Sequence, residues 1–132
     1  MLEHFGITVK SIENSTVWYR ENFGFEEVKR FDKPGLELKG AVIKLDDISL
    51  ELLQPYKISE KENNHIEKGI LLEDLLAQAG LAHIAISVKD LESAYKEIKG
   101  SNPVYLTEIF ESKYFFCADP DGILLEIKQA KT

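Results

Sequence analysis

The sequence predicts an α+β fold made of two tandem β-α-β-β-β modules. Together they would form a curved eight-stranded mixed sheet with the helices on one face. Two observations carry this prediction: residues 4–10 recur in pattern as residues 83–89, and residues 48–54 recur as residues 123–129. A recurring pattern of this length indicates that each copy is one structural unit built in the same way.

The first module is expected to run over residues 1–54 as a strand, a helix and three further strands. In residues 4–9 small or polar side chains alternate with bulky apolar ones, and a period of two is typical of a strand. Ser11 can cap the helix that follows, and Gly24 can end it in the left-handed conformation. The remaining strands are expected at about 25–31, 38–45 and 48–54, with turns at 32–35 and 46–47.

The second module, residues 81–132, repeats this order after a linker at 55–80. Within the linker, a polar loop at 57–68 contains His65, expected as a surface residue, and leucines at helical spacing follow at 70–78. The second module is expected to comprise strands at 82–88, 104–110, 113–118 and 123–129, a helix from Asp90 to about Lys99, and a tight turn at 119–122. We expect the whole chain, 1–132, to be a single domain.

Composition narrows the class of protein. The net charge of −7 disfavours nucleic acid as a partner, because a binding face for nucleic acid is basic. A single cysteine cannot form an internal disulfide, so we expect a reducing compartment, the cytoplasm, and a buried Cys117 without catalytic role. No signal peptide and no apolar run of membrane-spanning length is visible, so we expect no membrane association.

The repeat places one histidine and one glutamate at matching positions in each module. His4 and His83 are each followed by small residues at alternate positions, which leaves room for a ligand on that face of the strand. Glu51 and Glu126 lie within apolar strands, where an unpaired carboxylate is costly. Two imidazoles and two carboxylates without a thiolate predict one divalent ion per site, such as Zn, Ni, Co, Mn or Fe.

These features resemble the vicinal oxygen chelate superfamily, which includes glyoxalase I, methylmalonyl-CoA epimerase, extradiol dioxygenases and drug-resistance proteins. The resemblance rests on residues 11–25, which match the family's first helix and its end, and on the turn at 119–122 leading to Glu126. It covers nearly the whole length and implies a single glyoxalase-like domain. It also implies a metal held by the first and last strands of each module, which falls on His4, Glu51, His83 and Glu126.

The resemblance further implies proton transfer beside a carbonyl, an isomerisation like that of lactoylglutathione lyase, on a small oxygenated substrate. Glu126 would be the base, with Glu51 as the second choice. Thr8 and Pro55 stand where the family's glyoxalases have glutathione-binding residues, which argues against glutathione.

Two alternatives stay open: a racemase like methylmalonyl-CoA epimerase, and a non-catalytic protein that binds a drug or antibiotic. A ring-cleaving dioxygenase is disfavoured by the fourth ligand and the short chain. Small two-module relatives commonly pair, so we expect a homodimer, and the sequence leaves open whether the site is shared between its chains.

Overall fold

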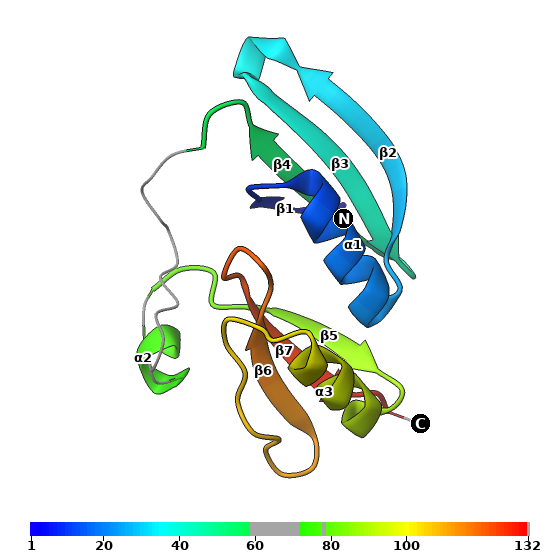
Figure 1. The fold of residues 1–132 in the computed structure, drawn as a ribbon, viewed down its shortest axis with the longest axis vertical. Coiled ribbons are helices and arrows are strands. Elements are labelled where there is room, and N and C mark those ends of the chain that lie inside the picture. Colours follow the sequence, from blue (N-terminus) through cyan, green and yellow to red (C-terminus); the bar gives the residue numbers. More distant parts are fainter. Residues whose placement is uncertain (59–71, 78, 132) are drawn as a thin grey trace. The chain divides into compact units, whose positions relative to one another are not determined.

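The structure is a computed structural model that describes residues 1–58, 72–77 and 79–131. The chain divides into two compact units, Met1–Lys61 and Glu62–Thr132, here called unit 1 and unit 2 (Figure 1). Each unit is described by itself. His65 and most of the predicted linker lie outside the described residues.

Unit 1 is a four-stranded mixed sheet with one long helix. Its elements are β1 (Phe5–Thr8), α1 (Ile12–Phe23), β2 (Glu26–Lys33), the 3-10 turn η1 (Pro34–Leu36), β3 (Leu38–Leu45) and β4 (Ile48–Pro55). The strand order is β1-β4-β3-β2, with β1 parallel to β4 and the other neighbours antiparallel. This is the predicted β-α-β-β-β order.

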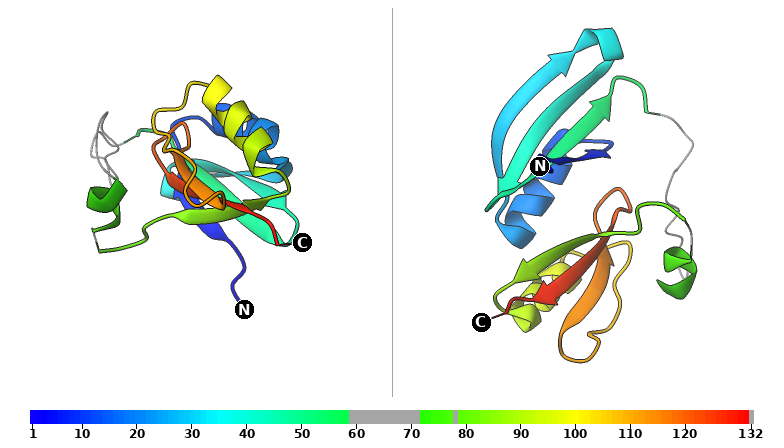
Figure 2. Two further views of the ribbon diagram at one scale, coloured as in Figure 1. Left: turned by 90° about the horizontal axis from the view of Figure 1, so that it is seen from below. Right: turned by 180° about the vertical axis from the view of Figure 1, so that it is seen from behind.

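Helix α1 covers one face of the unit 1 sheet (Figure 2). The Ser11 hydroxyl accepts a hydrogen bond from the Asn14 N–H at 3.1 Å, and Gly24 ends the helix with φ of 85°, as predicted. Alternation in the strands turns every second side chain to the helix side. The fully buried core there comprises Val9, Tyr19, Ala41, Ile43, Leu50 and Leu52.

Unit 2 repeats the plan with fewer strands. Its elements are α2 (Leu72–Leu76), β5 (Ile84–Val88), α3 (Leu91–Gly100), β6 (Tyr114–Ala118) and β7 (Leu124–Gln129), and the sheet order is β5-β7-β6. Strands β5 and β7 are parallel, as β1 and β4 are in unit 1. The Asp90 carboxylate caps α3 by accepting from the Ser93 N–H at 3.1 Å.

A glutamine at the same place in each copy holds the start of each long helix. The Gln54 side-chain oxygen accepts from the Ile12 N–H at 2.9 Å, and the Gln129 side-chain oxygen accepts from the Leu91 N–H at 3.0 Å. Both N–H groups are in the first turn, where the helix itself offers no acceptor. The last strand of each unit is thereby tied to its helix by the same contact.

The α+β class and the tandem modules are as predicted, but the eighth strand is not found: the described residues form seven. Residues 104–110 make only isolated bridges, Leu106 with Cys117 and Phe110 with Tyr114. The Phe116 N–H donates to the Thr107 hydroxyl at 3.0 Å, where a continuous strand would present a backbone carbonyl. A side chain that takes over a backbone bond interrupts the ladder.

Among the described residues, no helix combines the length and the apolar character needed to cross a membrane. Cys117 is fully buried in β6, as predicted. Burial, aided by the nearby charge of Asp119, raises the pKa of its thiol to about 12. The side chain is therefore a neutral, apolar part of the core.

Candidate functional site

His4 and Glu51 lie next to each other at one end of the β1–β4 pair. His4 directly precedes β1, and Glu51 pairs in register with Gly6, two residues further along. His4 Nε2 is 3.7 Å from Glu51 Oε2, and the two side chains are 38% and 25% exposed. Parallel pairing of these strands is thus what brings together two residues distant in sequence.

His83 and Glu126 repeat this arrangement in unit 2. His83 directly precedes β5, and Glu126 pairs in register with Ala85, again two residues further along. His83 Nε2 is 3.8 Å from Glu126 Oε1, and the side chains are 28% and 18% exposed. The Phe116 and His83 rings pack edge to face with centroids 5.3 Å apart, and this contact restricts the orientation of the imidazole.

Neither imidazole is hydrogen-bonded to its glutamate, because both separations exceed hydrogen-bond length. Two ligands that each lie about 2.1 Å from one ion are about 3 Å apart at a right angle and about 4.2 Å apart on opposite sides. The observed separations fall inside that range. Each pair therefore has the chemistry and the spacing of two ligands of one divalent ion.

The outer ring nitrogens of the two histidines differ. His4 Nδ1 lies 3.2 Å from Glu3 Oε1. In the tautomer that carries its proton on Nδ1, this nitrogen donates to Glu3 and Nε2 keeps the lone pair that a metal ligand needs. His83 Nδ1 is buried and has no hydrogen-bond partner among the described residues.

The structure brings the four predicted ligands together as two separate pairs, His4 with Glu51 and His83 with Glu126. Among the described residues, no group of three or more His, Cys, Asp or Glu side chains forms a metal site. The two pairs belong to different units, so the four-ligand set remains a prediction.

A cleft of about 440 Å³ opens on the sheet face of unit 1 that α1 leaves free. His4 and Glu51 lie at its β1–β4 side, with Val42 of β3 in the middle and side chains of β2 opposite. The lining residues are Glu3, His4, Val28, Lys29, Phe31, Lys33, Val42, Ser49 and Glu51. The first histidine–glutamate pair therefore faces a cavity large enough for a small molecule.

Sequence reasoning missed the β2 side of this cleft. Lys29, Phe31 and Lys33 are spaced two apart, so all three point to the same face of the strand. The signal was present as an alternation of lysine and phenylalanine. It carried no weight because the second module has no counterpart of it.

The turn at 119–122 is formed as predicted. The buried Asp119 side chain accepts from the N–H groups of Asp121 at 2.9 Å and Ile123 at 2.8 Å, and Gly122 takes a φ of 84°. The turn joins β6 to β7 and so sets the position of Glu126 along the sheet.

The model of the glyoxalase/bleomycin resistance protein/dioxygenase superfamily matches residues 1–127. The chain belongs to this superfamily. The match covers both modules and includes the two histidines and the two glutamates of the repeat. None of the curated proteins compared with the sequence matches it.

Solved structures of the superfamily share the fold. The trypanothione-dependent glyoxalase I of Leishmania major is 20% identical with a TM-score of 0.78, covering 98% of this chain and 86% of that one. A glyoxalase family protein from Enterococcus faecalis is 21% identical with a TM-score of 0.70, covering 98% and 97%. The fosfomycin resistance protein FosX of Listeria monocytogenes is 17% identical with a TM-score of 0.68, covering 99% and 92%. At these identities the likeness establishes the fold alone.

Proposed function

We propose that this protein is a metal-dependent enzyme that transfers a proton beside a carbonyl group of a small oxygenated substrate, as glyoxalase I does. His4, Glu51, His83 and Glu126 would together hold one divalent ion, as either one chain or a pair of chains brings the two pairs into one site. The observation that carries the proposal is the identical construction of the two pairs, with N–O separations of 3.7 and 3.8 Å. A duplicated surface feature without a role would have no reason to keep matching geometry.

A bound divalent ion would act as a Lewis acid that polarises two adjacent substrate oxygens and stabilises negative charge as the proton leaves. The protein's own residues do the rest. Glu126, the less exposed of the two glutamates, would accept the proton, with Glu51 as the alternative base. The Glu3 carboxylate would keep the proton of His4 on Nδ1 and so leave Nε2 free as a ligand.

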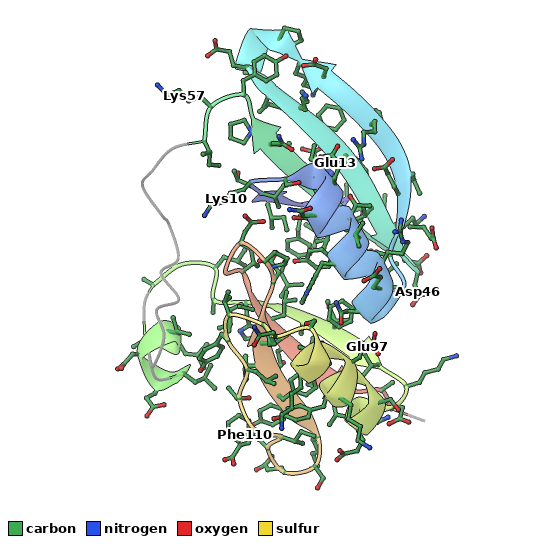
Figure 3. All side chains as sticks on the ribbon, viewed as in Figure 1. Lys10, Glu13, Asp46, Lys57, Glu97 and Phe110 are labelled. Atoms are coloured by element: carbon green, nitrogen blue, oxygen red, sulfur yellow. The ribbon has the colours of Figure 1, made fainter. Side chains whose placement is uncertain are left out.

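Metal binding is the first test. Calorimetric titration of the metal-stripped protein with Zn²⁺ or Co²⁺ should give one ion per site, and His4→Gln, Glu51→Gln, His83→Gln and Glu126→Gln should each weaken binding by more than about tenfold. Glu97→Gln is the matched control, because Glu97 is an exposed residue of α3 (Figure 3). If all four variants bind metal as tightly as the control, the proposed ligand set is wrong.

Proton transfer is the second test. Hydroxyacetone has two adjacent oxygens and a C–H beside a carbonyl, so exchange of that proton with deuterated solvent can be followed by NMR in a series of 2-hydroxy ketones. Glu126→Gln should abolish exchange while some metal stays bound, because the amide keeps an oxygen but lacks the basicity. Exchange at the wild-type rate with matched metal content would reduce Glu126 to a ligand and leave Glu51 as the base.

We also propose a homodimer, since a site assembled from modules of two chains is a common solution for small proteins of this architecture. Light scattering at micromolar concentration should give twice the chain mass of 15.0 kDa. A monomer that still binds one metal ion through all four residues would contradict the dimer and leave the enzyme proposal intact.

A further inference from the structure

We propose that the cleft-facing side of β2 is an anion-binding subsite. In it, Lys29 and Lys33 receive a carboxylate or phosphate group of the ligand, and Phe31 receives the apolar part beside that group. The inference rests on the proposed function only in taking this ligand to be the enzyme's substrate. The subsite itself consists of residues of unit 1 and requires no metal.

The charges of β2 are sorted between its two faces. On the helix side, Arg30 binds the carboxylates of Glu13 and Glu27 at 2.8 and 2.7 Å, and Asp32 accepts a hydrogen bond from the Tyr56 hydroxyl. Arg30, Glu27 and Asp32 therefore each have an opposite charge or a polar partner. On the cleft side, no described carboxylate forms an ion pair with Lys29 or Lys33.

Two lysines that no described carboxylate neutralises are unexpected in this cleft, because the chain carries a net charge of −7. Lysines that only solubilise the surface have no reason to line a cavity of about 440 Å³. An anion that binds between them would gain from both charges, and more than in open water because the cavity walls exclude part of the solvent.

Phe31 forms the floor between the two lysines. Its ring lies directly over Gly40 of the neighbouring strand: a Cβ at Gly40 would come within 2.7 Å of Phe31 Cε1 and closer still to Cζ and Cε2. The missing side chain lets the ring rest against the sheet. Lys33 Nζ lies over the ring, 5.2 Å from its centroid, in a cation–π contact that places its charge beside the aromatic surface.

The order of strands separates the two ends of the ligand. Glu51 lies on β4 and the lysines on β2, with Val42 of β3 between them in the lining. Neighbouring strands are about 4.8 Å apart, so the two sides of the cleft are separated by roughly 10 Å at the backbone. The carboxylates of Glu3 and Glu51 would repel an anion at the opposite side. The geometry thus fits a ligand whose anionic group is remote from its reacting end.

Phenyl phosphate is a suitable probe, since it combines an anionic group with an aromatic ring. Phenol is its uncharged counterpart. We expect phenyl phosphate at millimolar concentration to shift the backbone amide resonances of residues 29–33 and 40–42 in the metal-stripped chain, with phenol binding at least about tenfold more weakly. The double variant Lys29→Gln/Lys33→Gln should weaken phenyl phosphate binding by about tenfold or more and leave phenol unchanged.

Lys39→Gln is the matched control, because Lys39 is an exposed lysine on the other face of the adjacent strand β3. It changes the net charge without touching the cleft, so it should not affect binding. Rising salt should weaken phenyl phosphate binding and leave phenol binding unaffected.

The subsite proposal is wrong if phenyl phosphate and phenol bind equally well, or if the double variant binds phenyl phosphate as wild type does. It is also wrong if the shifts lie outside the cleft or if no resonance shifts. The proposed enzyme activity fails separately. Loss of metal binding in His4→Gln tests that site alone, whereas the anion titration contains no metal.

Discussion

Replacing Gly40 by alanine should reveal how the floor of the cleft is built. In a strand interior, alanine is favoured over glycine by about 0.5–1 kcal/mol, because less backbone freedom is lost on folding. The new methyl group, however, would overlap the Phe31 ring. The backbone cannot yield easily because Gly40 is buried within the β2–β3–β4 ladder, so the ring has to move.

The cost of moving the ring follows from the area that it buries. A phenylalanine buries about 150–250 Å² when fully enclosed, and Phe31 is only half-buried. Lifting it from the sheet would re-expose roughly 60–100 Å², or about 1.5–2.5 kcal/mol at ~25 cal/mol per Å². The cost exceeds the backbone gain, so Gly40→Ala should destabilise unit 1 by about 0.5–2 kcal/mol.

The decisive result is a reversal of sign. With Phe31→Ala in place the ring that overlaps the new methyl group is gone, and Gly40→Ala should then stabilise by about 0.5–1 kcal/mol. Urea unfolding followed by fluorescence measures both values, since the single tryptophan, Trp18, lies in α1 and reports on unit 1. Gly6→Ala is the control: its methyl group would meet Leu53 Cδ1 at an ordinary 3.8 Å. Equal destabilisation by Gly40→Ala in both backgrounds would refute the account.

Three further outcomes are expected. Because burial raises the pKa of Cys117 from 9.0 to about 12, the neutral thiol should contribute fully to stability below pH 9, and this contribution should decline as the pH rises towards 12. A urea unfolding midpoint that falls less over this pH range in Cys117→Ala than in wild type would confirm this. Asp119→Ala should destabilise by about 2–3 kcal/mol in urea unfolding, because it removes the acceptor of two turn N–H groups. Arg30 lowers the pKa of Glu13, so this pair should stabilise the fold above the ordinary pKa of 4.5 and lose that effect as the pH falls through the lowered value. NMR titration of the Glu13 carboxyl in wild type and in Arg30→Gln measures the shift. Identical titration curves would contradict it.

The elements of unit 1 could be predicted because local signals and the tertiary structure agree. Ser11 and Gly24 mark the ends of α1, and each lies where its own chemistry is needed. The strands at 38–45 and 48–54 were predicted to within a residue, because period-two alternation is enforced by a sheet with one buried face. The prediction of a strand at 104–110 was wrong, because side-chain alternation does not indicate whether a threonine hydroxyl replaces a backbone carbonyl as the hydrogen-bond acceptor.

The histidine–glutamate pairs were predictable for a different reason. A repeat constrains register: if His4 and Glu51 are neighbours across parallel strands, the same spacing makes His83 and Glu126 neighbours. The relation between the two pairs does not follow from the repeat. It depends on how the units associate, which is a matter of surfaces and not of strand register.

The two modules differ most where the cleft has its cationic side. In unit 1 the strand after the helix is β2, eight residues long, and it carries Lys29, Phe31 and Lys33 into the cleft. In unit 2 the corresponding stretch is the interrupted segment 104–110. The first and last strands, which carry the histidines and glutamates, keep the same register in both units. Divergence is therefore concentrated in a strand that can change without disturbing the proposed ligands. Under the proposed function, this makes β2 the element that sets which substrate is accepted, while the paired strands β1–β4 and β5–β7 set the chemistry.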